Sequence, residues 1–437
     1  MMKRRNVLFE DALELALEKA KLAANISKEI TLVRDFRGRI RLLLPGNKED
    51  YKEDKEKQLF ALCKELSKAL ANYGFPPERM ALFSDDLVQD ISSALSRDRL
   101  LIRQEQNIPI FLLDRQIIGH DWLRESFTGE ISNPRVAFFG IKGGVGRSTA
   151  LIIWAWRLAK QGKKVLIFDL DLESPGVSST ILPKSSMPDF GIVDWFVEDG
   201  VGQAENVEDE MAAASPLAQG LPGEIRIVPA YGSKTNEYLP KLARCYSDSA
   251  GETSESWGAR LERLVVGFEE RLKPDIVILD SRAGIHDIAA SAVTRMEALS
   301  LLFAVDSPQT WKAYEFLFHH WKQHPNLPKL RERLQIVASM IPETGREEYV
   351  NRFRTNAWDL FRNHLYEEAE PNMPDAFSFD IDDEDAPHYP LLVFWHRALQ
   401  EFNPIGIREG INEKTANEAL EEFVNRAFLF AFGEEYK

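Results

Sequence analysis

Short, continuously apolar runs alternate with longer segments of helical character between residues 134 and 342. Runs of this kind are typical of buried strands. They lie at 136–139, 165–168, 225–230, 276–279, 301–305 and 334–341. Because helical stretches separate most of them, the pattern predicts an α/β fold for this part of the chain.

Residues 1–130 show a different pattern, in which helical periodicity precedes further strand-like runs. The elements that it predicts are helices over 9–24 and 58–73, a hairpin of 30–36 and 39–44 across Arg37-Gly38, and strands at 100–102 and 108–113. We therefore expect a small α+β module over 1–130, which serves partner recognition or regulation or is a structural extension. A linker at 126–134 would join it to a second domain over 131–437.

Two polar stretches interrupt the strand pattern of the second domain. Residues 198–223 are rich in Glu, Gly and Ala, and residues 247–256 are rich in Ser and Glu. Both compositions are typical of connecting segments, so we expect mobile loops there.

A glycine-rich turn, Gly140 to Gly146, lies between the first buried run and the helix that follows it. Strand, glycine-rich turn and helix together are the geometry of a phosphate cradle. Glycine lets backbone N–H groups converge on an anion because no Cβ blocks their approach. The helix N-terminus adds unsatisfied N–H donors and the positive end of its dipole. The turn predicts a triphosphate site; the alternative is a glycine-rich turn without a ligand.

The run Lys142 to Thr149, K-G-G-V-G-R-S-T, resembles the deviant Walker A motif of ParA/MinD-type ATPases, the SIMIBI branch of P-loop proteins. The usual form of that motif is K-G-G-V-G-K-[ST]-[ST]. The resemblance implies that Lys142 reaches across a dimer to the partner's phosphates and that Arg147 holds the β- and γ-phosphates of its own subunit. It also implies that Ser148 ligates Mg²⁺ and that Thr149 contacts the α-phosphate.

A second motif ends the next apolar run with Asp169-Leu170-Asp171. In doubly wound sheets a ligand lies outside the carboxyl ends of the strands. The resemblance implies that Asp169 holds a Mg²⁺-bound water and that Asp171 orients the attacking water. The alternative is a strand that ends in a polar turn.

A third motif, Asp280-Ser281-Arg282-Ala283-Gly284, resembles the family's Walker B and switch II segment, with Arg-Ala in place of two prolines. The resemblance implies that Asp280 lies behind the Mg²⁺ ligands and that Gly284 brings a backbone N–H to the γ-phosphate. Arg282 could bind a γ-phosphate oxygen with its fork of donors or pair with an acid on the surface.

These motifs together give the candidate site. Lys142, Asp171 and Asp280 are the candidate catalytic residues, and Ser148, Asp169 and Asp280 the candidate magnesium site. The residues expected to bind the nucleotide are Gly143, Gly144, Val145, Gly146, Arg147, Ser148, Thr149, Asp169, Arg282 and Gly284. The asparagine that reads adenine in the family is not evident at 334–342, so ATP rather than GTP follows from the resemblance alone.

Arg147 departs from the family's lysine, and the exchange is not conservative because a guanidinium is bulkier and planar. The site would either hydrolyse ATP with altered geometry or bind nucleotide and turn over very slowly. We favour slow hydrolysis, because Asp169, Asp171 and Asp280 are all present and a site that only binds would not need a water-orienting acid.

The composition of the chain indicates the class of protein and the cellular compartment to expect. The chain has 437 residues, 44% of them hydrophobic and 28% charged, which is typical of a packed protein of two or three domains. Its N-terminus lacks the apolar core of a signal peptide, and no apolar run is long enough to span a membrane. Cys63 and Cys245 form no ligand pattern, which argues against a cysteine-bound metal and fits a reducing cytoplasm.

The net charge of the chain indicates whether DNA or a membrane is an expected partner. The net charge is −15, and because acids and bases balance within 1–130, nearly all of the negative charge lies on the ATPase half. This argues against non-specific DNA binding. The apolar C-terminus, 420–432, contains a single basic residue and is expected to pack on the ATPase core rather than dock on a membrane.

Two further polar clusters are expected to have no metal-binding role. His320 and His324 are expected on an ordinary helix face, and residues 380–385 are expected to form a solvated acidic loop rather than a cation site.

Taken together, the sequence predicts a doubly wound, mostly parallel P-loop sheet with a small N-terminal α+β module, and the resemblance covers roughly 134–400. It implies Mg²⁺-dependent ATP binding and slow hydrolysis in a homodimer that controls a partner protein. The alternatives are a nucleotide-sensing scaffold without turnover and a bacterial tyrosine kinase, although this tail has only Tyr436. The K-G-G-V-G-R variant also resembles components of bacterial conflict and phage-defence systems.

Overall fold

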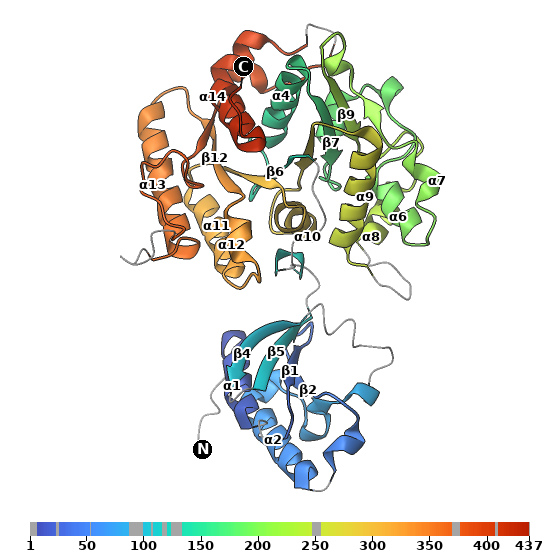
Figure 1. Ribbon diagram of the computed structural model, residues 1–437, viewed down its shortest axis with the longest axis vertical. Coiled ribbons are helices and arrows are strands. Elements are labelled where there is room, and N and C mark those ends of the chain that lie inside the picture. The colour runs from blue at the N-terminus through green and yellow to red at the C-terminus, as the bar shows by residue number, and fades with distance from the viewer. Residues whose placement is uncertain are drawn as a thin grey trace. The chain divides into compact units, whose positions relative to one another are not determined.

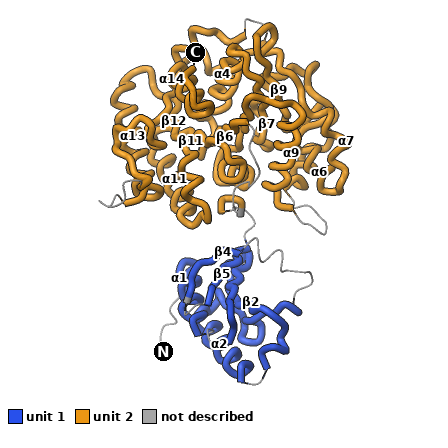
Figure 2. Tube along the Cα trace, viewed as in Figure 1, with its two compact units in different colours: residues 1–118 blue, residues 119–437 orange. Residues whose placement is uncertain are grey.

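The computed structural model describes residues 7–22, 26–52, 54–86, 99–105, 108–115, 120–123, 133–246, 255–368, 376–406 and 410–436. The chain divides into two compact units, 1–118 and 119–437 (Figure 2). This division lies before the expected boundary at 130, because the 3₁₀ turn η6 (His120–Leu123) belongs to the second unit. There Trp122 is buried against Phe139 and Trp321. Most of the expected linker at 126–134 lies outside the described residues.

The second unit is built on a sheet that comprises eight strands within the described residues (Figure 1). In chain order they are β6 (Arg135–Gly140), β7 (Lys164–Asp169), β8 (Ala213–Ala214), β9 (Glu224–Val228), β10 (Ile276–Asp280), β11 (Leu299–Ala304), β12 (Leu334–Ile341) and β13 (Leu391–Phe394). Their order in the sheet is β13-β12-β11-β6-β10-β7-β9-β8, and β8 is antiparallel to β9 while the other neighbours run parallel. The prediction of a mostly parallel sheet is confirmed.

Helices cover both faces of this sheet, as a doubly wound fold requires. They are α4 (Arg147–Lys160), α5 (Val177–Ile181), α6 (Ile192–Asp199), α7 (Glu205–Glu208), α8 (Tyr238–Cys245), α9 (Trp257–Leu272), α10 (Asp287–Ala290), α11 (Pro308–Trp321), α12 (Leu327–Arg331), α13 (Arg346–His364) and α14 (Glu413–Phe432). Figure 1 shows α4 and α14 on one side of the sheet and α9, α10 and α11 on the other. The strands are apolar on both faces because both faces are covered.

The expectation of a mobile loop over 198–223 is wrong. This segment contains α7 and the edge strand β8, and it buries Val207 and Met211 against the helices on one face of the sheet. Because Glu, Gly and Ala dominate this segment, its composition is typical of a loop, although a few apolar side chains pack it against the sheet. The second expected loop, 247–256, lies almost wholly outside the described residues.

The C-terminal helix α14 packs against α4 and β13, as expected from its apolar face. Phe423 is fully buried between Phe138 and Phe303, with ring centroids 6.1 and 5.9 Å away. No helix among the described residues is long and apolar enough to cross a membrane.

The first unit is a small α+β module, as expected. Its described elements are α1 (Phe9–Ala20), β1 (Ile30–Arg34), β2 (Ile40–Leu43), α2 (Asp54–Leu70), β3 (Ala81–Leu82), β4 (Leu100–Glu105) and β5 (Ile108–Asp114). The predicted hairpin is confirmed as the antiparallel pair β1–β2, within a sheet ordered β3-β2-β1-β5-β4. Helices α1 and α2 share an apolar core with one face of this sheet.

Removal of the Phe423 ring tests the packing of α14. We expect Phe423→Ala to lower the free energy of unfolding by about 3–5 kcal/mol, because the ring is fully buried and its loss leaves a cavity. Urea unfolding measures the change. Leu429→Ala on the same helix is the control, since that side chain is 38% exposed. Equal effects of the two substitutions would contradict the packing described for α14.

Candidate nucleotide site

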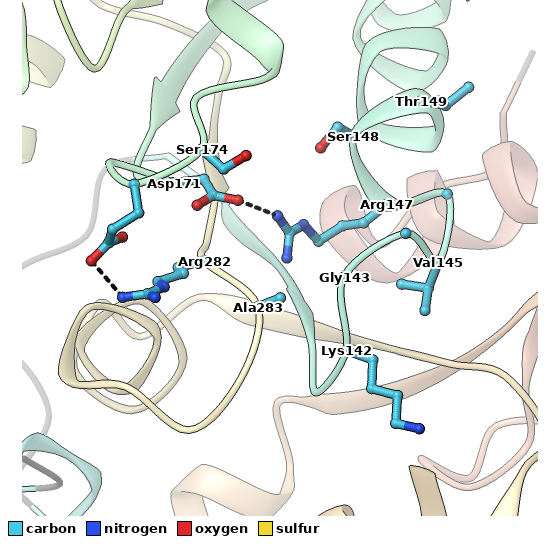
Figure 3. A pocket seen from close by; sticks show the side chains of 13 residues that line it. Lys142, Gly143, Val145, Arg147, Ser148, Thr149, Asp171, Ser174, Arg282 and Ala283 are labelled. Atoms are coloured by element: carbon cyan, nitrogen blue, oxygen red, sulfur yellow. Dashed lines mark hydrogen bonds and ion pairs between the residues drawn. The ribbon is translucent and has the colours of Figure 1, made fainter. Parts of the chain in front are cut away.

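A cavity of about 520 Å³ opens where β6, β7 and β10 end, beside the start of α4 (Figure 3). The carboxyl ends of parallel strands lie at one edge of a sheet, so residues far apart in sequence meet there. The lining comprises Lys142, Gly143, Gly144, Val145, Gly146, Arg147, Ser148, Thr149, Asp171, Glu173, Ser174, Arg282 and Ala283. The three sequence motifs therefore converge on one cavity.

The loop that leads into α4 adopts a conformation that its glycines permit. Gly144 and Gly146 have φ of +74° and +77°, in the left-handed region that other residues rarely adopt. Gly146 directly precedes α4, and the first hydrogen bond of the helix runs from the Ala150 amide to the Gly146 carbonyl. The preceding amides, at the start of the helix beside the cavity, lack intrahelical acceptors and suit an anion.

The Arg147 side chain lines the cavity and forms ion pairs with two acidic side chains. Its Nε donates to Oδ1 of Asp280 at 2.9 Å, and its Nη2 lies 3.3 Å from Oδ2 of Asp171. The side chain is only 7% exposed. Ser148 donates its hydroxyl to the other oxygen of Asp280 at 3.2 Å. The positive guanidinium therefore offsets part of the negative charge of these carboxylates.

Asp169 lies beside Asp280 in the sheet and is fully buried. It is the register partner of Asp280 on the neighbouring strand. One carboxylate oxygen accepts hydrogen bonds from the amide and hydroxyl of Ser178, whereas Oδ1 has no hydrogen-bond partner in the described part of the chain. Burial, and then the charge of Asp280, raises the pKa of Asp169 to about 7. Burial also raises the pKa of Asp280, and Arg147 opposes that rise.

These oxygens fit a magnesium site that is completed by phosphate. Mg²⁺ is held in proteins by one or two carboxylates together with waters and substrate phosphates. The hydroxyl of Ser148 and the buried carboxylates of Asp169 and Asp280 are hard oxygen donors of this kind. Among the residues that the structure describes, no group of three or more His, Cys, Asp or Glu could hold a metal by itself.

Arg282 pairs with an acid, which was one of the two roles that its sequence position left open. Its Nη1 donates to Oε1 of Glu173, and the hydroxyl of Tyr246 donates to the same oxygen. Figure 3 shows Arg282 on the opposite side of the cavity from Gly143. Glu173 was not among the candidate residues, although it follows Asp171 by two positions in the same motif.

Lys142 and Gly284 lie apart from the buried acids. The Lys142 Nζ donates to Oε1 of Gln309, at the start of α11, at 2.6 Å, and Figure 3 shows the side chain pointing away from Asp171. Gly284 has φ of +91° and is not part of the lining. Its amide donates to the carbonyl of Gly140 at 3.0 Å. The expected approach of that amide to a γ-phosphate would require this hydrogen bond to break.

The other polar clusters that the sequence suggested take no part in this cavity. Helix α11 ends at Trp321, so His324 follows the helix and does not share a face with His320. His324 instead accepts a hydrogen bond from the Asn326 amide, at 3.1 Å. Residues 380–385 form turns in which their own amides bond to Asp380 and Asp383.

The raised pKa of Asp169 predicts how stability depends on pH. An unfolded aspartate ionises near pH 3.9, so the folded chain retains a proton on Asp169 that the unfolded chain has lost between about pH 4 and 7. Stability from this group is therefore present below pH 4 and is lost as the pH rises through about 7. Asparagine stays neutral and still offers Ser178 an acceptor.

We therefore expect the free energy of unfolding of Asp169→Asn, relative to the parent chain, to rise between about pH 4 and 7. Urea unfolding in EDTA at several pH values measures this difference. Asp380→Asn, an exposed position, serves as the control. Parallel stability curves for Asp169→Asn and the parent chain would show that the buried carboxyl carries no such proton.

Comparisons with known proteins bear on this site. Residues 136–340 match the family described as CobQ/CobB/MinD/ParA nucleotide binding domain. No curated protein matches the chain in sequence. Among solved structures, a protein from Corynebacterium diphtheriae is 14% identical, with coverage of 69% of this chain and 100% of that one and a TM-score of 0.44.

Two further solved structures are similar to this chain. The ParA of pNOB8, bound to nonspecific DNA, is 16% identical, with 68% of this chain and 94% of that chain covered and a TM-score of 0.38. Cobyrinic acid a,c-diamide synthase from Mycobacterium smegmatis, with bound ATP analogue and magnesium, is 14% identical, with 55% and 86% covered and a TM-score of 0.37. The matched region, residues 136–340, includes the glycine loop and the strands that carry Asp169 and Asp280, so the similarity to the CobQ/CobB/MinD/ParA nucleotide-binding domains covers the site.

Proposed function

We propose that this protein is a Mg²⁺-dependent, slowly hydrolysing ATPase that works as a dimeric switch and controls a partner protein. The observation that carries the proposal is the convergence of the glycine loop, the acid that follows β7 and the Arg282 segment on one cavity of about 520 Å³. The cobyrinic acid a,c-diamide synthase structure, with its ATP analogue and magnesium, supports ATP and Mg²⁺ as the ligands to test first.

Different residues of the site would bind the phosphates, hold the magnesium ion and orient the attacking water. The amides of Gly143 to Thr149 would bind the phosphates, with Thr149 at the α-phosphate. Ser148, Asp169 and Asp280 would hold the magnesium ion, which offsets the charge of the β- and γ-phosphates. Asp171 would accept a hydrogen bond from the attacking water and hold it in line.

Arg147 must change partners for this to happen. Its guanidinium is bound to Asp280 and Asp171, so it can reach the β- and γ-phosphates only when at least one of these ion pairs opens. Opening the pair with Asp171 would also free the carboxylate oxygen that the water needs. Burial raises the pKa of Asp171 and Arg147 opposes that rise, so release of Arg147 makes this carboxylate a better proton acceptor. Exchange of buried ion pairs is the physical reason why we propose slow turnover.

Lys142 is the residue proposed to complete the site of a second subunit. Its Nζ lies outside the buried acids and donates to the neutral side-chain amide of Gln309 at 2.6 Å. An ammonium held this way can exchange its amide partner for a phosphate at little cost. The alternative is that Lys142 simply solvates its own loop, and its contact with Gln309 is consistent with that alternative too.

A second candidate function is a nucleotide-gated scaffold without turnover. The specific observation in its favour is that Arg147 is buried and holds both acids at once. If nucleotide binds without displacing the guanidinium, Asp171 stays occupied and no water is oriented. The two functions share the cavity and differ in the rate of hydrolysis.

The α+β module of residues 1–118 is a candidate for partner recognition or regulation, and a role in a bacterial conflict or phage-defence system is the process that we propose for it. A cytoplasmic location and weak DNA binding by the acidic half belong to the same proposal. A neighbouring effector gene would support the defence role.

Hydrolysis per subunit, measured across protein concentrations, tests the dimeric ATPase. We expect the rate per subunit to rise with concentration, and Lys142→Ala to abolish the rise, because the ammonium would act on the partner's phosphates. Lys164→Ala is the matched control, since that exposed lysine begins β7 at the opposite edge of the sheet. A rate per subunit that is independent of concentration would exclude the shared site.

Replacement of Arg147 separates the two candidate functions. We expect Arg147→Lys to bind Mg²⁺-ATP and to hydrolyse it at least tenfold faster, because a single ammonium cannot hold Asp171 and Asp280 as a planar fork does. Single-turnover hydrolysis with pre-bound nucleotide measures the chemical step. Absence of turnover in the parent chain despite nucleotide binding, together with turnover in Arg147→Lys, would favour the scaffold.

A further inference from the structure

The segment where the chain enters the second unit is anchored in its interior. This is η6, residues 120–123. Trp122 is 1% exposed, and its ring centroid lies 5.8 Å from those of both Phe139 and Trp321. Phe139 belongs to β6, the strand that leads into the glycine loop. Asp121 is also buried, at 4% exposure, although it carries a charge.

Asp121 is bound to one helix through three different groups. Its carboxylate Oδ2 accepts a hydrogen bond from the Ser291 hydroxyl at 2.9 Å, and its carbonyl accepts one from the Thr294 hydroxyl at 3.0 Å. Its amide donates to Oδ1 of Asp287 at 3.3 Å. These partners belong to α10 and to the π-helical segment η9 (Ser291–Arg295) that continues it. Departures from α-helical geometry of this kind occur frequently at functional sites.

The same helix continues directly from the loop that lines the nucleotide cavity. Arg282 and Ala283 belong to the lining, and α10 begins at Asp287, three residues after Gly284. The Gly284 amide is held by the Gly140 carbonyl. If a γ-phosphate takes up this amide, the loop must turn, and the start of α10 must move with it. Asp287, which accepts from the backbone amide of Asp121, lies at that start, and Ser291, which donates to the Asp121 carboxylate, directly continues the same helix.

We propose that Asp121 is a positioning residue of the nucleotide site, which couples the junction between the two units to the 281–286 loop. The inference rests on the proposed function. The hydrogen bonds of Asp121 favour the arrangement in which Gly284 bonds to Gly140, so docking of residues 120–123 and binding of a triphosphate oppose each other. Linkage makes the effect reciprocal: a triphosphate loosens the 120–123 segment, and loosening that segment tightens triphosphate binding. A diphosphate lacks the γ-phosphate and leaves the loop in place.

Calorimetric titration of the full chain with Mg²⁺-ATPγS and with Mg²⁺-ADP tests the coupling. We expect Asp121→Ala to bind ATPγS about fivefold or more tightly than the parent chain, with ADP affinity unchanged. Asp121→Asn keeps an acceptor oxygen for Ser291 and should restore the parent value. Ser339→Ala is the matched control, because its buried hydroxyl bonds to the Ala304 carbonyl instead of to η6. Equal shifts for ATPγS and ADP, or no shift, would overturn the coupling and leave Asp121 a structural residue.

Hydrogen exchange of the parent chain keeps the inference testable if Asp121→Ala folds poorly. We expect amides in the peptide that contains 120–123 to exchange faster with ATPγS bound and unchanged with ADP bound. Unchanged exchange in a chain that demonstrably binds ATPγS overturns the coupling alone. Failure of the parent chain to bind either nucleotide overturns the proposed function, and the coupling with it.

Discussion

The pairing of one guanidinium with the acids at the ends of two neighbouring strands is the interaction on which the site depends. Asp169, Asp171 and Asp280 meet there because β7 and β10 are parallel neighbours in register. Burial of several carboxylates in one place is unfavourable unless a cation or protons offset the charge. Arg147 supplies the cation, and burial raises the pKa of Asp169, which favours the neutral form of that carboxyl. This balance fixes where the glycine loop meets the strands.

The same balance explains why one residue supports two opposed functions. A guanidinium stays charged under all ordinary conditions, so Arg147 cannot leave the acids by losing a proton. It leaves only if phosphate attracts it more strongly than two carboxylates do, or if magnesium replaces it beside Asp280. A lysine in the same place would hold its acids less firmly and would exchange them more readily. In the proposed function, binding affinity, metal dependence and turnover are therefore linked through a single side chain.

Sequence alone gave the location of the site and the class of the fold, because both depend on local pattern. The glycine loop needs residues that tolerate a left-handed backbone, and the buried strands need continuous apolar runs, so Gly144, Gly146 and the strands of the central sheet were predictable. The partners of the charged groups were not, since they depend on how distant segments meet. The attachment of Arg147 to Asp171 and Asp280, the pair of Glu173 with Arg282, and the Gly284–Gly140 hydrogen bond are all of this kind.

The errors have similar causes. The segment 198–223 has a loop-like composition, yet a few apolar side chains such as Met211 fold it onto the sheet. His324 follows His320 by the spacing of one helical turn, but the helix ends between them. The boundary near residue 130 was placed by the polar composition of 126–134, whereas packing divides the chain at 118, since Trp122 is a core residue of the second unit.

The position of Trp122 has a consequence for any attempt to separate the two halves, by cloning or by proteolysis. A fragment that began at residue 131 would lack Trp122 and would open a hollow lined by Phe139 and Trp321, at a loss of about 3–5 kcal/mol if the site resembles a truncated core tryptophan. A fragment from residue 119 keeps that ring.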